Sequence, residues 1–269
     1  MLVLIQGALS NKQVIYELDP PHLLADGPLR KEDIEQKLEL LEKKVDRLGS
    51  NIDRVLITDS VLGFPRVPAI YVADHLVNKL AKEGRRRPEV MCSLRTCDHS
   101  VNAIVQMVFE AMISGIKGIL FVRGDPPRFG GSLNPEFPSR VVAKLREIGF
   151  KNHHMRFYVA TPATLNKKDV DRKIASGADG LVTQIMRTPS EMKEISSYAA
   201  GRVAEIIGTI MVPSEANAPS AKMFDFDVSL YSKEPAKFVS SVLSYSTGVL
   251  VTSPRSFEDG LETVKHIQR

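Results

Sequence analysis

Short apolar runs alternate with longer amphipathic stretches along most of the chain. The runs are rich in β-branched and aromatic residues, as strands are. Eight such runs are found, at 14–18, 54–58, 89–94, 118–122, 156–160, 180–184, 205–211 and 248–253. Most of them are continuously apolar, which is typical of parallel strands buried on both faces. The pattern therefore predicts a parallel sheet that is covered on both sides.

Between these runs, apolar residues recur at spacings of three and four. The clearest case extends from Ile34 to Leu48, where the spacing places the apolar side chains on one helical face. Helices are predicted at 31–48, 68–83, about 99–115, 138–148, 167–176, 189–200 and about 255–267. Asp98 is placed to cap the third of them.

Eight strand–helix units in 269 residues match the order and the approximate length of an α/β fold, the (β/α)8 or TIM barrel. No linker, low-complexity tract or change of composition divides the chain, so we expect one domain over 1–269. The main alternative is a doubly wound open sheet, which usually carries a glycine-rich phosphate turn after its first strand. Here that turn reads ELDPPHLL, with no glycine before Gly27.

Composition narrows the class of protein. Apolar residues make up 43% and charged residues 25%, ordinary values for a soluble globular protein. The net charge is +4, with basic residues interleaved among acidic ones, which does not favour a nucleic-acid partner. No stretch reaches the 18–20 apolar residues of a membrane helix, and the N-terminus lacks a signal-peptide pattern. We therefore expect a cytoplasmic protein without a membrane partner.

The two cysteines, Cys92 and Cys97, do not suggest a disulfide framework. As metal ligands they would need further partners, and only His99 lies close by in the sequence. We expect two ordinary thiols and no metal site.

In a (β/α)8 barrel, functional side chains lie at the C-terminal ends of the strands. Glu17 follows three apolar residues of the first strand. Burial there raises a carboxyl pKa and suits the group to proton donation near neutral pH. The alternative is an ion pair with Arg95 or Arg123 across the barrel mouth. We favour a functional role, because a lone acid in an apolar strand is costly unless it is used or paired.

The segment VRGDPP, at 122–127, ends the fourth strand and allows two interpretations. Aspartate between glycine and proline is common turn chemistry. Alternatively the segment is an active-site loop, in which Gly124 lets the backbone approach a flat ring and the prolines hold Asp125 in place. Gln184 ends the sixth strand and adds an amide, which could also simply bond a neighbouring loop. Together these side chains fit acid-assisted chemistry on a heterocycle, but they do not identify the reaction.

Four motifs together resemble the methylenetetrahydrofolate reductase family. They are YELDPP (16–21), FVRGDPP (121–127), KIASGADGLVTQ (173–184) and IIGTIMVPS (206–214). Each motif is short, but they occur in order at the ends of the first, fourth, sixth and seventh predicted strands. The resemblance covers most of the predicted barrel.

The resemblance implies a barrel that binds FAD, receives hydride from NADH or NADPH, and reduces 5,10-methylenetetrahydrofolate to the 5-methyl form. It implies that Glu17 is the general acid, that Asp125 lies by the pterin and the flavin, and that Gln184 hydrogen-bonds the pterin. The positions that match flavin-contacting residues are Thr58, Arg123 and Lys173. We also expect a homo-oligomer.

The sequence departs from the family mainly at the flavin end. Where the family has a Pro-His pair in strand three, this chain has Cys92 and Ser93. The loop after strand five lacks the family's histidine and glutamate, and Phe137 replaces a tyrosine after strand four. FAD would then be bound weakly, replaced by FMN, supplied in a complex with a partner subunit, or absent, with hydride passing directly from nicotinamide to the substrate.

Two other functions stay open. One is a non-redox pterin-binding or assembly subunit that kept the barrel and lost the cofactor. The other is an unrelated barrel enzyme, such as a lyase that uses Glu17 and Arg123 on an anionic substrate.

Overall fold

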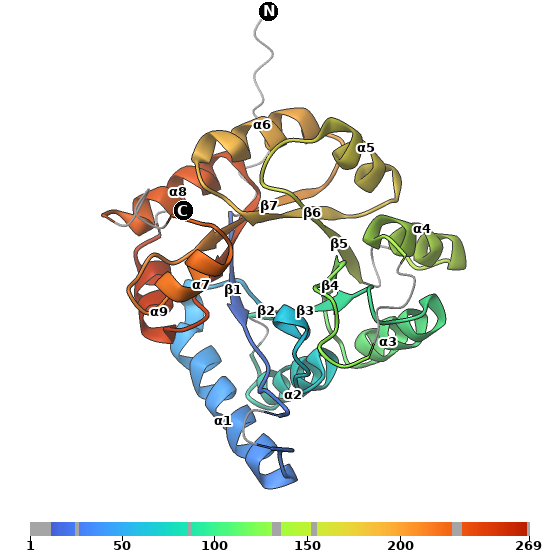
Figure 1. Cartoon of the computed structure of the whole chain (residues 1–269), viewed down its shortest axis with the longest axis vertical. Coiled ribbons are helices and arrows are strands. Elements are labelled where there is room, and N and C mark those ends of the chain that lie inside the picture. The colour runs from blue at the N-terminus through green and yellow to red at the C-terminus, as the bar shows by residue number, and fades with distance from the viewer. Residues whose placement is uncertain are drawn as a thin grey trace, which may run out of the picture.

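The computed structural model describes residues 12–24, 27–85, 88–130, 136–151, 155–227 and 233–267. Eight parallel strands close into a barrel in sequence order, each paired with the next and β8 with β1. Helices surround the barrel on the outside (Figure 1). The predicted (β/α)8 fold is confirmed.

The strands agree with the predicted ranges to within one residue at each end. They are β1 Gln13–Leu18, β2 Arg54–Ile57, β3 Glu89–Arg95, β4 Gly118–Val122, β5 Arg156–Thr161, β6 Gly180–Ile185, β7 Glu205–Met211 and β8 Gly248–Thr252. The apolar runs were thus sufficient to predict the strands, because both faces of every strand are covered.

The helices differ from the prediction in two places. They are α1 Lys31–Leu48, α2 Ala69–Lys82, α3 Val101–Ile113, α4 Pro138–Ile148, α5 Lys167–Ala175, α6 Pro189–Ala199, α7 Ala218–Met223, α8 Pro235–Tyr245 and α9 Phe257–Lys265. Neither α7 nor α8, both between β7 and β8, was predicted. The cap of α3 is Ser100, whose hydroxyl accepts from the Ala103 N–H at 3.2 Å. Asp98 does not cap α3, because its carboxylate pairs with Arg95 at 3.0 Å.

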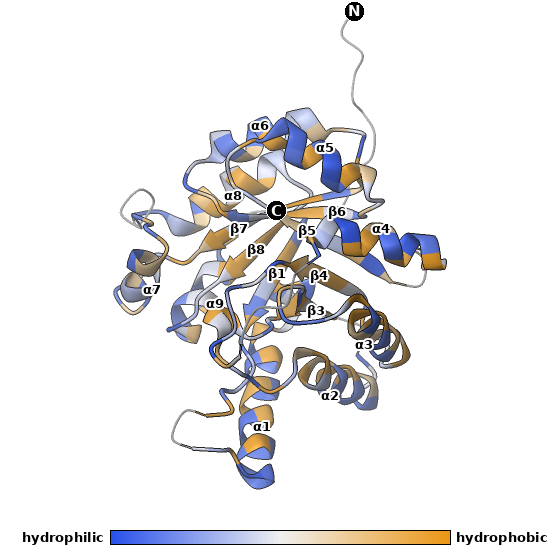
Figure 2. Ribbon diagram, turned by 45° about the vertical axis from the view of Figure 1, so that its right-hand side comes forward, coloured by the Kyte–Doolittle hydropathy of each residue, from blue (hydrophilic) through white to orange (hydrophobic). Residues whose placement is uncertain are grey.

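The core has two separate parts. One lies between the strands and the surrounding helices, and Figure 2 shows the apolar strands enclosed by helices of mixed character. The other fills the barrel interior with one side chain from each strand: Ile15, Leu56, Met91, Leu120, Tyr158, Val182, Ile207 and Leu250. The middle of the barrel is therefore packed and is not a channel.

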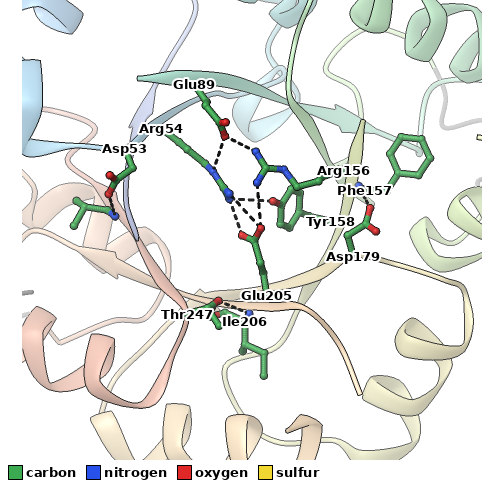
Figure 3. Close-up of polar contacts among 11 residues, drawn as sticks. Asp53, Arg54, Glu89, Arg156, Phe157, Tyr158, Asp179, Glu205, Ile206 and Thr247 are labelled. Carbon is green, nitrogen blue, oxygen red and sulfur yellow. Dashed lines mark hydrogen bonds and ion pairs between the residues drawn. The ribbon is translucent and has the colours of Figure 1, made fainter. Parts of the chain in front are cut away.

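A charged network lies below this layer, where β2, β3, β5 and β7 begin (Figure 3). Arg54 is 1% exposed and donates to Glu205 at 2.6 and 3.1 Å, to Glu89 at 3.2 Å and to the Tyr158 hydroxyl at 3.0 Å. Arg156 pairs with the same two glutamates. Two positive and two negative side chains thus compensate one another at the N-terminal end of the barrel.

Candidate active site

Glu17 stands at the mouth, which we define as the C-terminal ends of the strands and the loops that follow them. Its Oε1 accepts from the Thr252 hydroxyl of neighbouring β8 at 2.6 Å. Burial, together with the charge of Asp19, raises the pKa of Glu17 to about 7, while Thr252 and Arg66 act in the opposite direction. A carboxyl group with this pKa can both give and take a proton near neutral pH.

The alternative of an ion pair between Glu17 and Arg95 or Arg123 is wrong for the part of the chain that the structure describes. The Arg95 guanidinium is turned toward loop carbonyls and Asp98, and Arg123 lies over the ring of Phe137. Thr252 is the side chain that bonds Glu17. The acid is therefore oriented by a neutral donor, and neither Arg95 nor Arg123 forms an ion pair with it.

Asp19, two residues beyond Glu17, collects contacts from the loop after β2. The Thr58 hydroxyl donates to Asp19 Oδ1 at 2.6 Å. Arg66 Nη2 lies 3.4 Å from Asp19 Oδ2, and Arg66 Nη1 donates to the Pro20 carbonyl at 2.7 Å. Thr58, which the resemblance assigns to the flavin, is thus already bonded. The sequence did not indicate a role for Arg66, because this residue lies eight positions beyond Thr58 and not at the end of a strand.

Arg95 connects the loops that follow β2 and β4. Its side chain is 2% exposed and donates to the carbonyls of Ser60 and Asp125. The Arg95 side chain is therefore engaged by protein groups. This guanidinium is an internal connection between loops.

Gly124 is required by this packing. Its φ is +81°, a conformation that side-chain-bearing residues rarely adopt, and a Cβ there would lie 2.8 Å from Arg95 Nε. Asp125 is exposed, and its Oδ2 accepts from the Leu62 N–H at 3.2 Å. Leu62 itself has a φ of +59°. The segment VRGDPP thus has a structural role, and the Asp125 carboxylate remains on the rim of the mouth.

A further contact joins the same loops. The Arg128 N–H donates to the Gly63 carbonyl at 2.9 Å. A Cβ on Gly63, whose φ is +73°, would lie 2.1 Å from the Pro126 carbonyl oxygen. Since Gly63 belongs to the loop after β2, the loops after β2 and β4 are in direct backbone contact.

Two more of the expected flavin residues are buried and have partners. The Ser93 hydroxyl accepts from the Asp59 N–H at 2.8 Å. Lys173 on α5 pairs with Asp169, and burial lowers the pKa of its ammonium group. By contrast, Gln184 is exposed at the end of β6, where the pairing with β7 shifts register between Val182 and Ile185.

Three arginines surround Phe137, which is 40% exposed before α4. The guanidinium carbons lie 5.6 Å (Arg123), 5.8 Å (Arg140) and 5.1 Å (Arg172) from the ring centroid. We call these four residues the Phe137 cluster. It joins the loop after β4 to α4 and α5, and it combines positive charge with an aromatic face.

Two clefts are lined by residues other than the candidate site residues. One of about 500 Å³ is formed by the end of β7, the start of α8 and α9, and one of about 590 Å³ lies between α5 and α6. Neither is lined by Glu17, Asp125 or Gln184. We assign the candidate site to the mouth, because the titratable acid and the exposed amide are there.

Within the described ranges, no group of three or more His, Cys, Asp or Glu side chains is arranged to hold a metal ion. Cys92 and Cys97 are both buried free thiols. None of the helices in the described part of the chain has the length and apolar character needed to cross a membrane.

No protein-family model matches the chain, and no curated protein matches it. Its structure is similar to solved barrels. DHPS from Yersinia pestis with a pterine-sulfa conjugate has a TM-score of 0.54 at 10% identity, over 96% of this chain and 93% of that one. The 7,8-dihydropteroate synthase of Vibrio fischeri ES114 gives 0.52 at 14%, over 96% and 92%. Tryptophan synthase from M. tuberculosis gives 0.54 at 10%, over 97% and 94%. At these identities the likeness shows the fold alone.

Proposed function

We propose that this chain is a barrel enzyme of the methylenetetrahydrofolate reductase type. It reduces 5,10-methylenetetrahydrofolate, or a modified tetrahydropterin, to the 5-methyl form, with NADH or NADPH as the source of hydride. The observation that carries the proposal is Glu17, a carboxyl group at the mouth with a pKa of about 7 and a hydroxyl donor at 2.6 Å.

The chemistry requires an acid of this kind. Opening the five-membered ring of the substrate breaks a C–N bond, and the leaving nitrogen must take a proton, which protonated Glu17 supplies. The carboxylate that remains stabilises the iminium cation. Hydride then adds to the iminium carbon and gives the methyl group. The Thr252 hydrogen bond fixes the carboxyl orientation during this exchange.

The binding side of the mouth suits a pterin. Gln184 offers both a donor and an acceptor to the edge of a heterocycle. Asp125 adds an exposed carboxylate on the rim. A barrel of the same fold, DHPS of Yersinia pestis, has been solved with a pterine-sulfa conjugate, so the architecture is compatible with a pterin ligand.

The residues present fit the phosphate end of FAD better than its flavin end. In the Phe137 cluster, Arg123 and Arg172 would hold the diphosphate, and the exposed ring gives a planar group a face to stack on. Thr58 and Ser93, by contrast, already bond protein groups. When bound, the flavin would relay hydride from the nicotinamide to the iminium carbon. We therefore propose weak FAD binding, through the Phe137 cluster.

The decisive experiment is Glu17→Gln, with Glu39→Gln on the exposed face of α1 as the matched control. Pterin affinity and fold should be kept, while methylene reduction falls by about 10²–10⁴-fold, the usual size of general acid catalysis. The control should behave as wild type. Near-normal turnover by Glu17→Gln would refute the assignment of the acid. No nicotinamide oxidation by the wild type, with or without added FAD, would refute the reaction.

A second candidate is a non-redox pterin-binding subunit. The engagement of Thr58 and Ser93 in loop contacts favours it, because it removes two groups from the proposed flavin site. Calorimetric titration with a tetrahydropterin and with FAD distinguishes the two. Pterin binding without FAD binding and without nicotinamide oxidation supports the second candidate.

A further inference from the structure

Arg66 lies in the loop between β2 and α2, against the segment that follows β1. Its side chain is 10% exposed. Nη1 donates to the Pro20 carbonyl, and Nη2 lies 3.4 Å from the Asp19 carboxylate. Its Nε is buried without a hydrogen-bond partner among the described residues. A buried donor without a partner is uncommon in proteins and calls for an explanation.

Arg66 is not needed to hold the two loops together. Backbone hydrogen bonds connect them on both sides of it, from the Leu23 N–H to the Pro65 carbonyl at 3.2 Å and from the Val67 N–H to the Pro21 carbonyl at 2.9 Å. The loop after β2 would therefore stay in place without the guanidinium. Arg66 adds a positive charge beside the Asp19 carboxylate.

The positive charge of Arg66 acts on the proposed acid, Glu17. Glu17 is affected by the negative charge of Asp19 and by the opposing positive charge of Arg66. Among the described residues, the only other polar side chain found to act on it is the neutral Thr252, from β8. Arg66 and Asp19 also act in opposite directions on His22, whose pKa is lowered by burial and then by Arg66. The electrostatic balance at Glu17 thus depends on Asp19 and Arg66.

We propose that Arg66 is a positioning residue for the proposed acid Glu17, acting through Asp19 and the Pro20 carbonyl. Arg66 holds Asp19 where the Thr58 hydroxyl bonds it, and it limits the negative potential that Asp19 exerts on the acid. The catalytic consequence rests on the proposed function, whereas the electrostatic effect on Glu17 does not.

The test measures Glu17 directly. The carboxyl carbons of glutamate are labelled with ¹³C, and Glu17 is titrated by NMR, with Glu17→Gln identifying its signal. Arg66→Gln should raise the Glu17 pKa by about half a unit or more, because it removes an attractive charge. Arg66→Lys should restore most of the wild-type value, and Asp19→Asn should shift it the opposite way. The alkaline limb of the kcat/KM profile should move with each of these values.

The two proposals fail separately. If Glu17 titrates identically in wild type, Arg66→Gln and Asp19→Asn, all with native spectra, the role of Arg66 is refuted. A lower melting temperature in Arg66→Gln with an unchanged Glu17 pKa would likewise reduce Arg66 to a structural residue. If the NMR shifts occur as expected but no variant or wild type reduces a methylene substrate, the positioning role stands and the proposed function fails.

Discussion

Replacing Gly124 by alanine tests the connection between Arg95 and the loop after β4. Gly124 has a φ of +81°. A residue with a side chain is destabilised by about 1–2 kcal/mol in such a left-handed conformation. The new Cβ would also lie 2.8 Å from Nε and 2.9 Å from Cγ of Arg95, whose side chain is 2% exposed and held by several acceptors. Overpacking of this kind typically costs about 1–3 kcal/mol. We therefore expect Gly124→Ala to lose about 2–5 kcal/mol of unfolding free energy.

Gly130→Ala is the matched control, because Gly130 has a nearly equal φ of +78° and a Cβ added there would meet no atom of the described residues within 4 Å. It should lose only the conformational contribution, about 1–2 kcal/mol. Urea titration at fixed pH gives both values. If Gly124→Ala is no less stable than Gly130→Ala, the close contact with Arg95 does not constrain the loop and the reasoning fails.

Asp125→Ala should lose only about 0.5–1.5 kcal/mol of stability, since the exposed carboxylate accepts one bond from Leu62, and it should change kcat/KM far more; a large drop in melting temperature with unchanged kinetics would favour a turn role alone. Arg54→Ala should lower the unfolding free energy by about 3–5 kcal/mol in urea titration, because it leaves Glu205 without its main partner; a loss below about 1 kcal/mol would contradict this. Folding raises the Glu17 pKa from 4.5 to about 7, so the unfolding free energy of the wild type should fall as pH rises between these values. From pH 4 to pH 8, the unfolding free energy of Glu17→Gln should therefore rise by up to about 3 kcal/mol relative to that of the wild type. Melting temperatures that depend on pH in the same way in both proteins would refute this.

The strands were predictable because most of them are continuous apolar runs, but α8 was not. Its apolar positions, Phe238, Val239, Val242 and Leu243, do have helical spacing, and Pro235 is a good first helical residue. Serines and β-branched residues lower the helix propensity of the same segment. The segment forms a helix because its apolar face packs in the core, and the local sequence does not show this packing.

The acid of the candidate site was predictable, but its surroundings were not. Glu17 is identified by one polar position in an apolar strand, whereas its partner Thr252 is 235 residues away and reaches it only through barrel closure. Arg95 lies at the end of a strand, as the sequence indicates, but it bonds loop carbonyls and Asp98 and does not form the alternative ion pair with Glu17. An arginine side chain is long enough to turn back to the carbonyls of adjacent loops, and sequence position does not give its direction.

The contacts among Gly63, Arg95, Gly124 and Pro126 also have an evolutionary consequence. A Cβ on Gly63 would meet the Pro126 carbonyl of a different loop, and a Cβ on Gly124 would meet the buried Arg95 side chain at the end of β3. A change in one loop is therefore tolerated only when its neighbour changes as well, which is epistasis imposed by geometry. We expect these positions to covary among homologues, while the exposed residues of the same loops diversify independently and adapt the rim to new ligands.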